Sequence, residues 1–364
     1  MKTKLLILSV LLLAACSSGE QTLKKAFEGK FILGAAVNAA QITEADFRGD
    51  SVLLKHFAAV EPENCMKSAE IMPVFGQYDW TMADKYVDFG SKNGLEVFGH
   101  CLIWHSQCTP DFCFDKDGKL ISPDLLKERM KQHITSVMTR YKGRIKGWDV
   151  VNEAILEDGS YRQSPFWQIL GEEFIPWAFQ CAQEADPSCE LYYNDYSMHE
   201  PKKLEAVIEM VKKLQARGIR IDAVGFQGHI GMDYPDLALY ESHIRKVKDE
   251  TGLDVCITEL DMSILPTITR SADIAEAGKP RERIPDFRVD GIPEELQAAW
   301  NARMEDFVDM LLKNADVIRR VNLWGICDSD SWKNNWPIPG RYDAPLWVDR
   351  NYQLKPFLNK YIHE

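Results

Sequence analysis

The feature that most constrains the fold is a repeated alternation of short apolar, β-rich runs with helical stretches. Strands that alternate with helices pair in parallel, and their crossover connections are right-handed. Eight such runs occur in this chain of 364 residues, and eight parallel strands close a barrel. We therefore predict one α/β domain, a (β/α)8 TIM barrel. The expected strands span residues 31–37, 57–60, 95–104, 145–151, 190–193, 223–226, 255–258 and 321–326.

Two helices between these strands are defined well enough to place their ends. The first follows Ser122, a residue type favoured at the N-cap, with Pro123 at the first helical position. Its apolar side chains recur every three or four residues, and Gly143 is expected to end it. The second runs from about Pro293 to Leu311 with the same periodicity.

Residues 266–290 break the alternation, because they are polar, rich in Pro, Gly and Arg, and without usable periodicity. The segment follows the seventh expected strand, on the face where barrel enzymes keep their active sites. A long loop of this kind is either functional or tolerated. A lid or subsite wall is one interpretation and a tolerated insertion is the other, which we favour.

The N-terminus has the pattern of an export signal. Two lysines precede an apolar run over residues 5–13 that is too short to span a bilayer, so residues 1–15 are interpreted as a signal peptide. The sequence Leu13-Ala14-Ala15-Cys16 resembles a bacterial lipobox, in which Cys16 is lipidated and becomes the new N-terminus. The alternative is an ordinary signal peptide cleaved near Ala15.

The mature chain is then expected to be an exported bacterial lipoprotein, held to the membrane through its N-terminal lipid anchor. Residues 16–24 would form the tether and residues 25–364 the catalytic domain. Ser17 and Ser18 fit sorting to the outer membrane, and the face of that membrane is left open. The net charge of −12 excludes a nucleic-acid binder, which needs a basic face. We expect a monomer.

Eight further cysteines enter a compartment where disulfides can form. Three of them lie in apolar, strand-like runs, where buried free thiols are expected: Cys101, Cys256 and Cys327. Two pairs have a spacing that allows a bridge, namely Cys108 with Cys113 and Cys181 with Cys189. No Cys-x-x-Cys pair supports a zinc or redox motif.

Polar side chains follow nearly every expected strand at the place where the strand ends. The carboxyl ends of barrel strands share one mouth, so a full series of polar endings predicts an active site there. The endings are Glu63-Asn64-Cys65-Met66-Lys67, Gly99-His100, Trp104-His105-Ser106-Gln107, Asn152-Glu153, Asn194-Asp195-Tyr196, Gln227-Gly228-His229, Glu259-Leu260-Asp261 and Trp324.

Glu153 and Glu259 are the two carboxylates that suggest a reaction. They follow the fourth and seventh strands, close enough to face each other across a barrel of eight. A pair of carboxylic acids is what cleavage of a glycosidic bond needs. Asp261 shares the strand face of Glu259, and His229 between them would keep Glu259 ionised. Glu153, facing that negative charge, would have a raised pKa and stay protonated.

The motifs around these residues resemble those of glycoside hydrolase family 10, the retaining endo-β-1,4-xylanases. The similarity runs from Phe31 to the C-terminus. It rests on an ordered set of motifs: Glu-Asn-x-Met-Lys at 63–67, Gly-His-x-Leu-x-Trp-His-Ser-Gln at 99–107, Trp-Asp-Val-Val-Asn-Glu-Ala at 148–154, Tyr-Asn-Asp-Tyr at 193–196, Gly-Phe-Gln-Gly-His at 225–229, Ile-Thr-Glu-Leu-Asp at 257–261 and Leu-Trp-Gly-x-x-Asp-x-x-Ser-Trp at 323–332.

The resemblance implies a role for each of these residues. Glu153 would be the acid/base and Glu259 the nucleophile, with carboxyl groups about 5–5.5 Å apart. Asn152 would bind the hydroxyl next to the anomeric carbon, and His229 and Asp261 would support Glu259. Xylan and xylo-oligosaccharides are the implied partners, and no metal or cofactor is implied. The implied substrate-binding residues are Asn64, Lys67, His100, Trp104, Gln107, Asn194, Gln227, Trp324 and Trp332.

Two departures from the family pattern concern subsite preference. Ser68 stands where the family usually has Trp after the lysine, which predicts a more open wall beside Lys67. The 266–290 segment is also longer than the family pattern.

Three alternative functions are weighed against this prediction. A metal-dependent barrel hydrolase is disfavoured, because the chain has no His-x-His, and nucleotide and serine-hydrolase motifs are absent from the sequence. The same chemistry on cellulose or mixed-linkage glucan is the nearer alternative. A non-catalytic polysaccharide-binding lipoprotein is the other.

Overall fold

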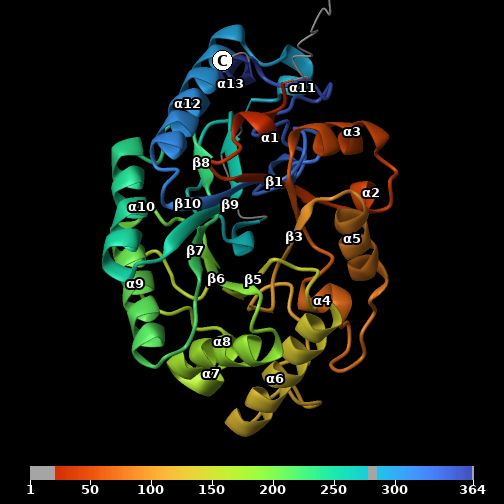
Figure 1. The fold of residues 1–364 in the computed structure, drawn as a ribbon, viewed down its shortest axis with the longest axis vertical. Coiled ribbons are helices and arrows are strands. Elements are labelled where there is room, and N and C mark those ends of the chain that lie inside the picture. Colours follow the sequence, from red (N-terminus) through yellow and green to blue (C-terminus); the bar gives the residue numbers. More distant parts are fainter. Residues whose placement is uncertain (1–20, 278–284, 363–364) are drawn as a thin grey trace, which may run out of the picture.

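The computed structural model describes residues 21–277 and 285–362. Within this part of the chain, eight parallel strands form one closed barrel with flanking helices, as the sequence predicts (Figure 1). The last strand pairs with both the first and the seventh, which closes the barrel. In order around the barrel, the strands are β1 (Ile32–Val37), β2 (Ala59–Pro62), β3 (Glu96–Gly99), β5 (Gly147–Asn152), β6 (Glu190–Asp195), β7 (Ala223–Phe226), β9 (Asp254–Ser263) and β10 (Ile318–Leu323).

Two short strands extend the barrel at its carboxyl end. β4 (Ile103–Trp104) continues the third strand and pairs with β5, and β8 (His229–Gly231) continues β7 and pairs with β9. β9 is therefore longer than the four residues expected from the sequence, since it bonds to β7, β8 and β10 over its ten residues. This extension brings Glu259 and Asp261 within one strand.

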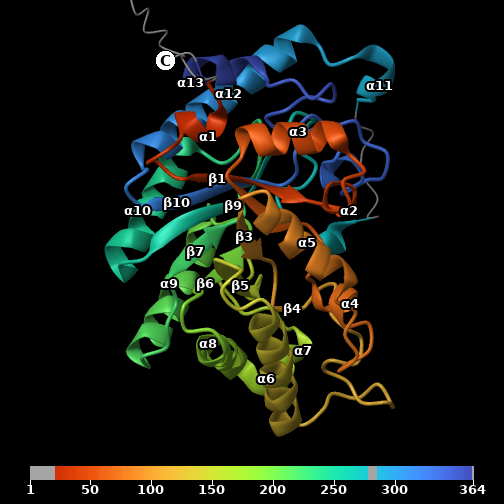
Figure 2. The same cartoon turned by 45° about the vertical axis from the view of Figure 1, so that its right-hand side comes forward.

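The helices surround the strands in both views (Figures 1 and 2). The α-helices are α1 (Leu23–Ala26), α2 (Ala39–Ile42), α3 (Phe47–His56), α4 (Ser68–Ile71), α5 (Thr81–Lys92), α6 (Pro123–Arg140), α7 (Pro165–Leu170), α8 (Phe174–Ala185), α9 (Pro201–Ala216), α10 (Leu237–Thr251), α11 (Phe287–Asp290), α12 (Glu294–Lys313) and α13 (Asn359–Ile362). The 3-10 turns are η1 (Gly171–Glu173), η2 (Ile274–Glu276), η3 (Trp332–Asn334) and η4 (Pro356–Leu358).

The two helices placed from the sequence begin where expected. Ser122 caps α6 by accepting a bond from the Leu125 amide, and Pro123 opens the helix. α12 begins directly after Pro293. α6 ends at Arg140, slightly before the predicted stop, and Gly143 takes the left-handed conformation in the turn that follows.

The described N-terminus packs earlier than the boundary expected from the sequence. Leu23 is fully buried at the start of α1, so the packed domain begins before residue 25. Within the described residues, no helix is long and apolar enough to cross a membrane.

The four cysteines whose spacing allowed two bridges are all free thiols: Cys108, Cys113, Cys181 and Cys189. Three other free thiols are buried as predicted: Cys101, Cys256 and Cys327.

The barrel interior holds an ion pair among apolar side chains. Arg320 on β10 donates to Glu61 on β2 at 3.0 Å, and its guanidinium lies 3.8 Å from the centre of the Phe98 ring. Both charged side chains are 1% exposed. A buried charge that loses its partner keeps its full desolvation cost. The pair therefore constrains how β10 meets β2 across the interior.

We expect Arg320→Met to lower the free energy of unfolding by about 3–5 kcal/mol, because Glu61 would be left buried without its cation. Denaturant unfolding measures this change. Adding Glu61→Gln to the same chain should recover part of the loss. Arg217→Met, which breaks the exposed pair with Glu173, serves as the control and should cost less than about 1 kcal/mol. Equal losses for both arginines would contradict the prediction.

Candidate active site

The polar strand endings converge on one pocket at the carboxyl end of the barrel. Nearly all the site residues predicted from the sequence line it, together with two residues of the 266–290 segment. Its lining is Glu63, Asn64, Lys67, His100, Trp104, Gln107, Asn152, Glu153, Gln227, His229, Glu259, Ala272, Ile274, Trp324 and Trp332.

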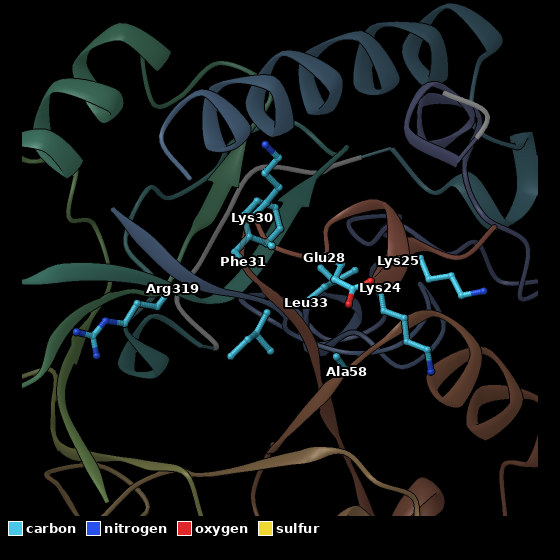
Figure 3. A pocket seen from close by; sticks show the side chains of 10 residues that line it. Lys24, Lys25, Glu28, Lys30, Phe31, Leu33, Ala58 and Arg319 are labelled. Atoms are coloured by element: carbon cyan, nitrogen blue, oxygen red, sulfur yellow. The ribbon is translucent and has the colours of Figure 1, made fainter. Parts of the chain in front are cut away.

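A second pocket opens at the opposite end of the barrel (Figure 3). It lies beside the start of β1 and next to α1, and its labelled side chains include Lys24, Lys30, Phe31 and Arg319. None of the residues that line it belongs to the polar endings of the strands. The pocket at the carboxyl end is therefore the candidate active site.

Glu153 follows β5 directly and is 6% exposed. Its carboxylate accepts hydrogen bonds from Trp104 Nε1 at 2.8 Å and from Gln227 Nε2 at 2.9 Å. Its backbone has φ +56°, a left-handed conformation that is uncommon for a residue with a side chain. Its amide donates to the carbonyl of Asn194 at 2.9 Å, which ties this backbone to β6.

Glu259 lies inside β9 and is 4% exposed. One carboxylate oxygen accepts a bond from Asn194 Nδ2 at 2.8 Å, and the other lies 3.2 Å from His229 Nε2. His229 Nδ1 is in turn 3.0 Å from Asp261 Oδ1. The Glu259–His229–Asp261 arrangement expected from the sequence is thus present, with Trp332 Nε1 also donating to Asp261 at 2.7 Å.

These surroundings drive the two pKa values apart. Burial raises the pKa of Glu153 to about 7, and the negative charge of Asp195 adds to the shift. The charge of Glu259, which was expected from the sequence to cause this shift, also raises the pKa of Glu153 but contributes less than burial and Asp195. Burial would raise the pKa of Glu259 too, but the hydrogen bond from His229, the charges of both histidines and the hydrogen bond from Asn194 outweigh it and lower the pKa from its usual value. Near pH 6 one carboxyl is protonated and the other ionised.

Asn194 takes a different place from the one expected of a substrate-binding residue. It is fully buried and does not line the pocket. Its amide donates to Asn152 at 3.1 Å as well as to Glu259, and its oxygen accepts from Thr258 at 2.6 Å. Asn194 therefore positions Glu259 from below. Asn152 Nδ2 has no partner within the described residues, and Asn152 lines the pocket.

Lys67 organises one side of the pocket. Its ammonium donates to Asn64 at 2.9 Å and to Gln107 at 2.7 Å, and it lies 4.9 Å from the centre of the Trp104 ring. Ser68, at the position where a Trp was expected, is buried at the start of α4.

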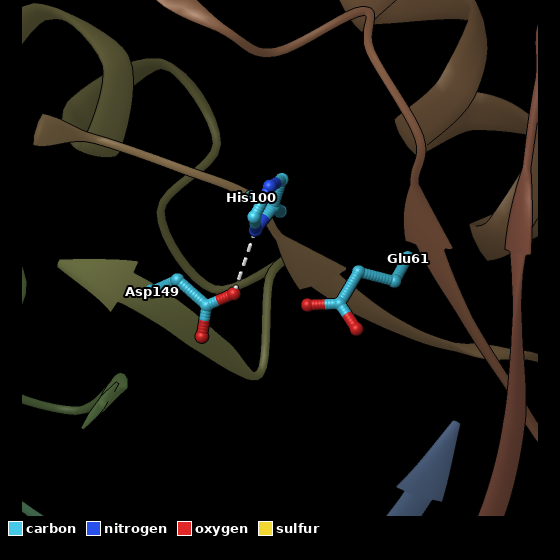
Figure 4. Close-up of side chains that lie close together, drawn as sticks. All are labelled: Glu61, His100 and Asp149. Atoms are coloured by element: carbon cyan, nitrogen blue, oxygen red, sulfur yellow. Dashed lines mark hydrogen bonds and ion pairs between the residues drawn. The ribbon is translucent and has the colours of Figure 1, made fainter. Parts of the chain in front are cut away.

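His100 is oriented from inside the barrel (Figure 4). Its Nδ1 lies 2.8 Å from Asp149 Oδ2, which leaves the other ring nitrogen for the pocket. Glu61, His100 and Asp149 are close enough to offer three ligand atoms to one metal ion. Arg320 already faces Glu61 at 3.0 Å, and its positive charge opposes a cation there. This cluster fits a structural network better than a metal centre.

Two tryptophans line the same pocket from the loop after β10. Trp324 is 7% exposed, and its ring packs edge-to-face with that of His100, with 5.4 Å between the ring centroids. Trp332 is half-buried and stacks on Trp336 at 4.6 Å. Indole faces of this kind can pack on the faces of sugar rings, with polar groups nearby to bind hydroxyls.

Sequence reasoning missed Arg162 and underrated the 266–290 segment. Ala272 and Ile274 line the pocket, so this part of the segment reaches the site. Arg162 donates to the backbone carbonyl of Glu153 at 3.0 Å and to Asp273 at 2.7 Å. The only signal for Arg162 was its place in the loop after β5.

A closed barrel with one protonated and one ionised carboxyl in its mouth defines the class of the protein, a glycoside hydrolase. The chain belongs to glycosyl hydrolase family 10, whose family model matches residues 22–363.

Individual relatives agree with this family. The chain is 43% identical to endo-1,4-beta-xylanase A of Xylanibacter ruminicola, over 98% of this chain and 96% of the relative. A GH10 endoxylanase from a sugarcane soil metagenome superposes with a TM-score of 0.87 at 37% identity, covering 94% and 99% of the two chains. A mutant structure in complex with xylotriose superposes with a TM-score of 0.83 at 32% identity, covering 94% and 99%.

We expect Glu153 to titrate near pH 7 and Glu259 below the usual pKa of a glutamate when the carboxyl carbons are followed by 13C NMR. In Glu259→Gln the pKa of Glu153 should fall, because a negative charge that favours its protonated form is removed. Glu28→Gln, exposed beside the opposite pocket, is the control and should leave the pKa of Glu153 unchanged. An unchanged pKa in Glu259→Gln would show that the two carboxyls are not coupled.

Proposed function

We propose that the protein is an endo-1,4-β-xylanase that cleaves internal β-1,4-xylosidic bonds of xylan with retention of anomeric configuration. The observation that carries this proposal is the pair of buried glutamates with opposite pKa shifts, held in a family 10 barrel. The name of the Xylanibacter relative supports xylan as the substrate.

In the first step Glu259 attacks the anomeric carbon as its bond to the leaving oxygen breaks. Glu153 donates its proton to that oxygen, so the leaving sugar departs as a neutral alcohol. A covalent glycosyl ester on Glu259 results. Trp104 and Gln227 aim the Glu153 carboxyl, and His229 with Asn194 orients the Glu259 carboxylate.

In the second step Glu153 acts as a base. It takes a proton from a water molecule, whose oxygen attacks the anomeric carbon and releases Glu259 as a carboxylate. Both glutamates return to their starting protonation states. All of these groups come from one chain, so we propose that a monomer is active.

The sugar whose anomeric carbon is attacked is called here the sugar ahead of the cleaved bond. It would lie on the side of Lys67. Xylan is neutral along its backbone, and amide and ammonium groups bind its hydroxyls while indole rings pack on the sugar faces. Asn152 Nδ2, which has no partner in the described residues, would bind the hydroxyl next to the anomeric carbon. The residues proposed to contact this sugar are Asn64, Lys67, His100, Trp104, Gln107, Gln227, Trp324 and Trp332.

We expect the purified chain from residue 20 to release short xylo-oligosaccharides from linear xylan, and Glu259→Ala to release none, because no covalent intermediate can form. Glu153→Ala should lose about 10²–10⁴-fold in kcat/KM. The pH profile of kcat/KM should be bell-shaped, with its basic limb near pH 7, where Glu153 loses its proton.

Two other outcomes of this experiment would favour the alternative functions. Product release from carboxymethyl-cellulose but not from xylan would keep the mechanism and overturn the substrate. Binding to xylan without product from either polymer would identify a binding protein.

We also propose that the chain is an exported lipoprotein anchored through Cys16 to the outer membrane. The support is the lysine, apolar run and Leu-Ala-Ala-Cys order of residues 1–16, which lie outside the described residues.

The full chain expressed in a bacterium is expected to be recovered in the membrane fraction with a lipid on its N-terminal Cys16. Cys16→Ser should move it to the soluble fraction, because no thioether to a lipid can form. Fractionation with mass spectrometry of the N-terminus measures both. Cys65→Ser is the matched control and should remain with the membrane. An unmodified N-terminus at Cys16 would indicate an ordinary signal peptide instead.

A further inference from the structure

The described part of the segment after β9 reaches both the pocket and the loop after β5. Ala272 and Ile274 line the pocket that contains both glutamates. Asp273, between them, accepts a hydrogen bond from Arg162 Nη1 at 2.7 Å. The two side chains are only 14% and 17% exposed, so solvent and salt screen this ion pair less than a surface pair.

Arg162 also contacts the backbone of Glu153. Its Nε donates to the Glu153 carbonyl at 3.0 Å, and its Nη2 donates to the Tyr196 hydroxyl at 2.7 Å. Glu153 has a left-handed backbone, which persists only where the surroundings hold it. Arg162 is one of the groups that hold it, and it joins the loops that follow β5, β6 and β9.

The position of this network around the barrel indicates which sugar it meets. The residues proposed to bind the sugar ahead of the cleaved bond come mainly from β2, β3 and β10. Arg162, Tyr196 and Asp273 come from the half of the mouth formed by β5, β6 and β9. Glu153 follows β5, where this half of the mouth borders β3, and it protonates the leaving oxygen, so we place the leaving sugar on the side of Asp273.

We propose that residues 272–274 form a wall of the subsite that receives the leaving sugar, and that the Asp273–Arg162 ion pair fixes this wall to the acid/base glutamate. Ile274 offers an apolar surface to the face of a xylosyl ring, and Asp273 is a positioning residue that acts through Arg162. The inference rests on the proposed function, because it assumes the reaction assigned to Glu153.

The experiment compares Ile274→Ala and Asp273→Asn with the unaltered enzyme on two substrates. An aryl β-xylobioside places its sugars ahead of the bond and only an activated phenol, which is no sugar and needs little help from the acid, on the leaving side, whereas xylotetraose places sugars in the leaving-sugar subsite. We expect kcat/KM on xylotetraose to fall about tenfold in each variant and on the aryl substrate to change less than about twofold.

Transfer to an acceptor gives an independent measurement. During turnover of the aryl substrate, added xylobiose competes with water for the glycosyl ester on Glu259. Its hydroxyl forms the new glycosidic bond, Glu153 takes the proton and Glu259 leaves. Because the acceptor occupies the leaving-sugar subsite, both variants should need more xylobiose for the same yield of transfer product.

Asp233→Asn is the matched control. Asp233 pairs with Arg270 and bonds Thr267, so this variant also loosens the segment after β9, but at an exposed site away from Arg162. It should leave both substrates unaffected. An equal loss on both substrates for Asp273→Asn, a loss for Asp233→Asn of the same size, or no loss on xylotetraose for Ile274→Ala would overturn the proposal. Failure of the unaltered enzyme on every xylan substrate would instead overturn the proposed function.

Discussion

Closure of the barrel is the constraint from which the site follows. β10 bonds to β1 on one side and to β9 on the other, so the strands form a ring and have no free edge. All of them run parallel, so every strand delivers its last residues to the same mouth. Glu153 and Glu259 are therefore placed three strands apart by the pairing.

The two glutamates show how a common fold position can give different chemistry. Both are almost fully buried, and burial alone would raise both pKa values. What separates them is the set of neighbours that each strand end supplies. Both accept hydrogen bonds, but Glu259 also faces the charges of His229 and His100, which favour its ionised form, whereas Glu153 faces the negative charge of Asp195, which opposes it. Asp195 keeps its charge inside the protein because Lys203 lies 2.7 Å from it as an ion-pair partner.

The parts of the structure that depend on local patterns could be predicted from the sequence. Strand positions follow from apolar runs, the start of α6 from Ser122 and Pro123, and the contact of His229 with Glu259 from neighbouring strand ends. The bond between Arg162 and Asp273 joins residues 111 positions apart in two irregular segments, and no periodicity marks it. Cysteine spacing likewise could not decide pairing, because a disulfide depends on geometry in three dimensions.

The place where the described chain enters the barrel has a consequence for how the enzyme would meet its polymer. α1 packs against β1 and α13 at the amino-terminal end of the barrel, opposite the mouth. A chain held to a surface ahead of residue 21 would therefore present its catalytic opening outward. A long, insoluble polysaccharide approaching from the surroundings would meet the open end first, and the anchored end would not obstruct it.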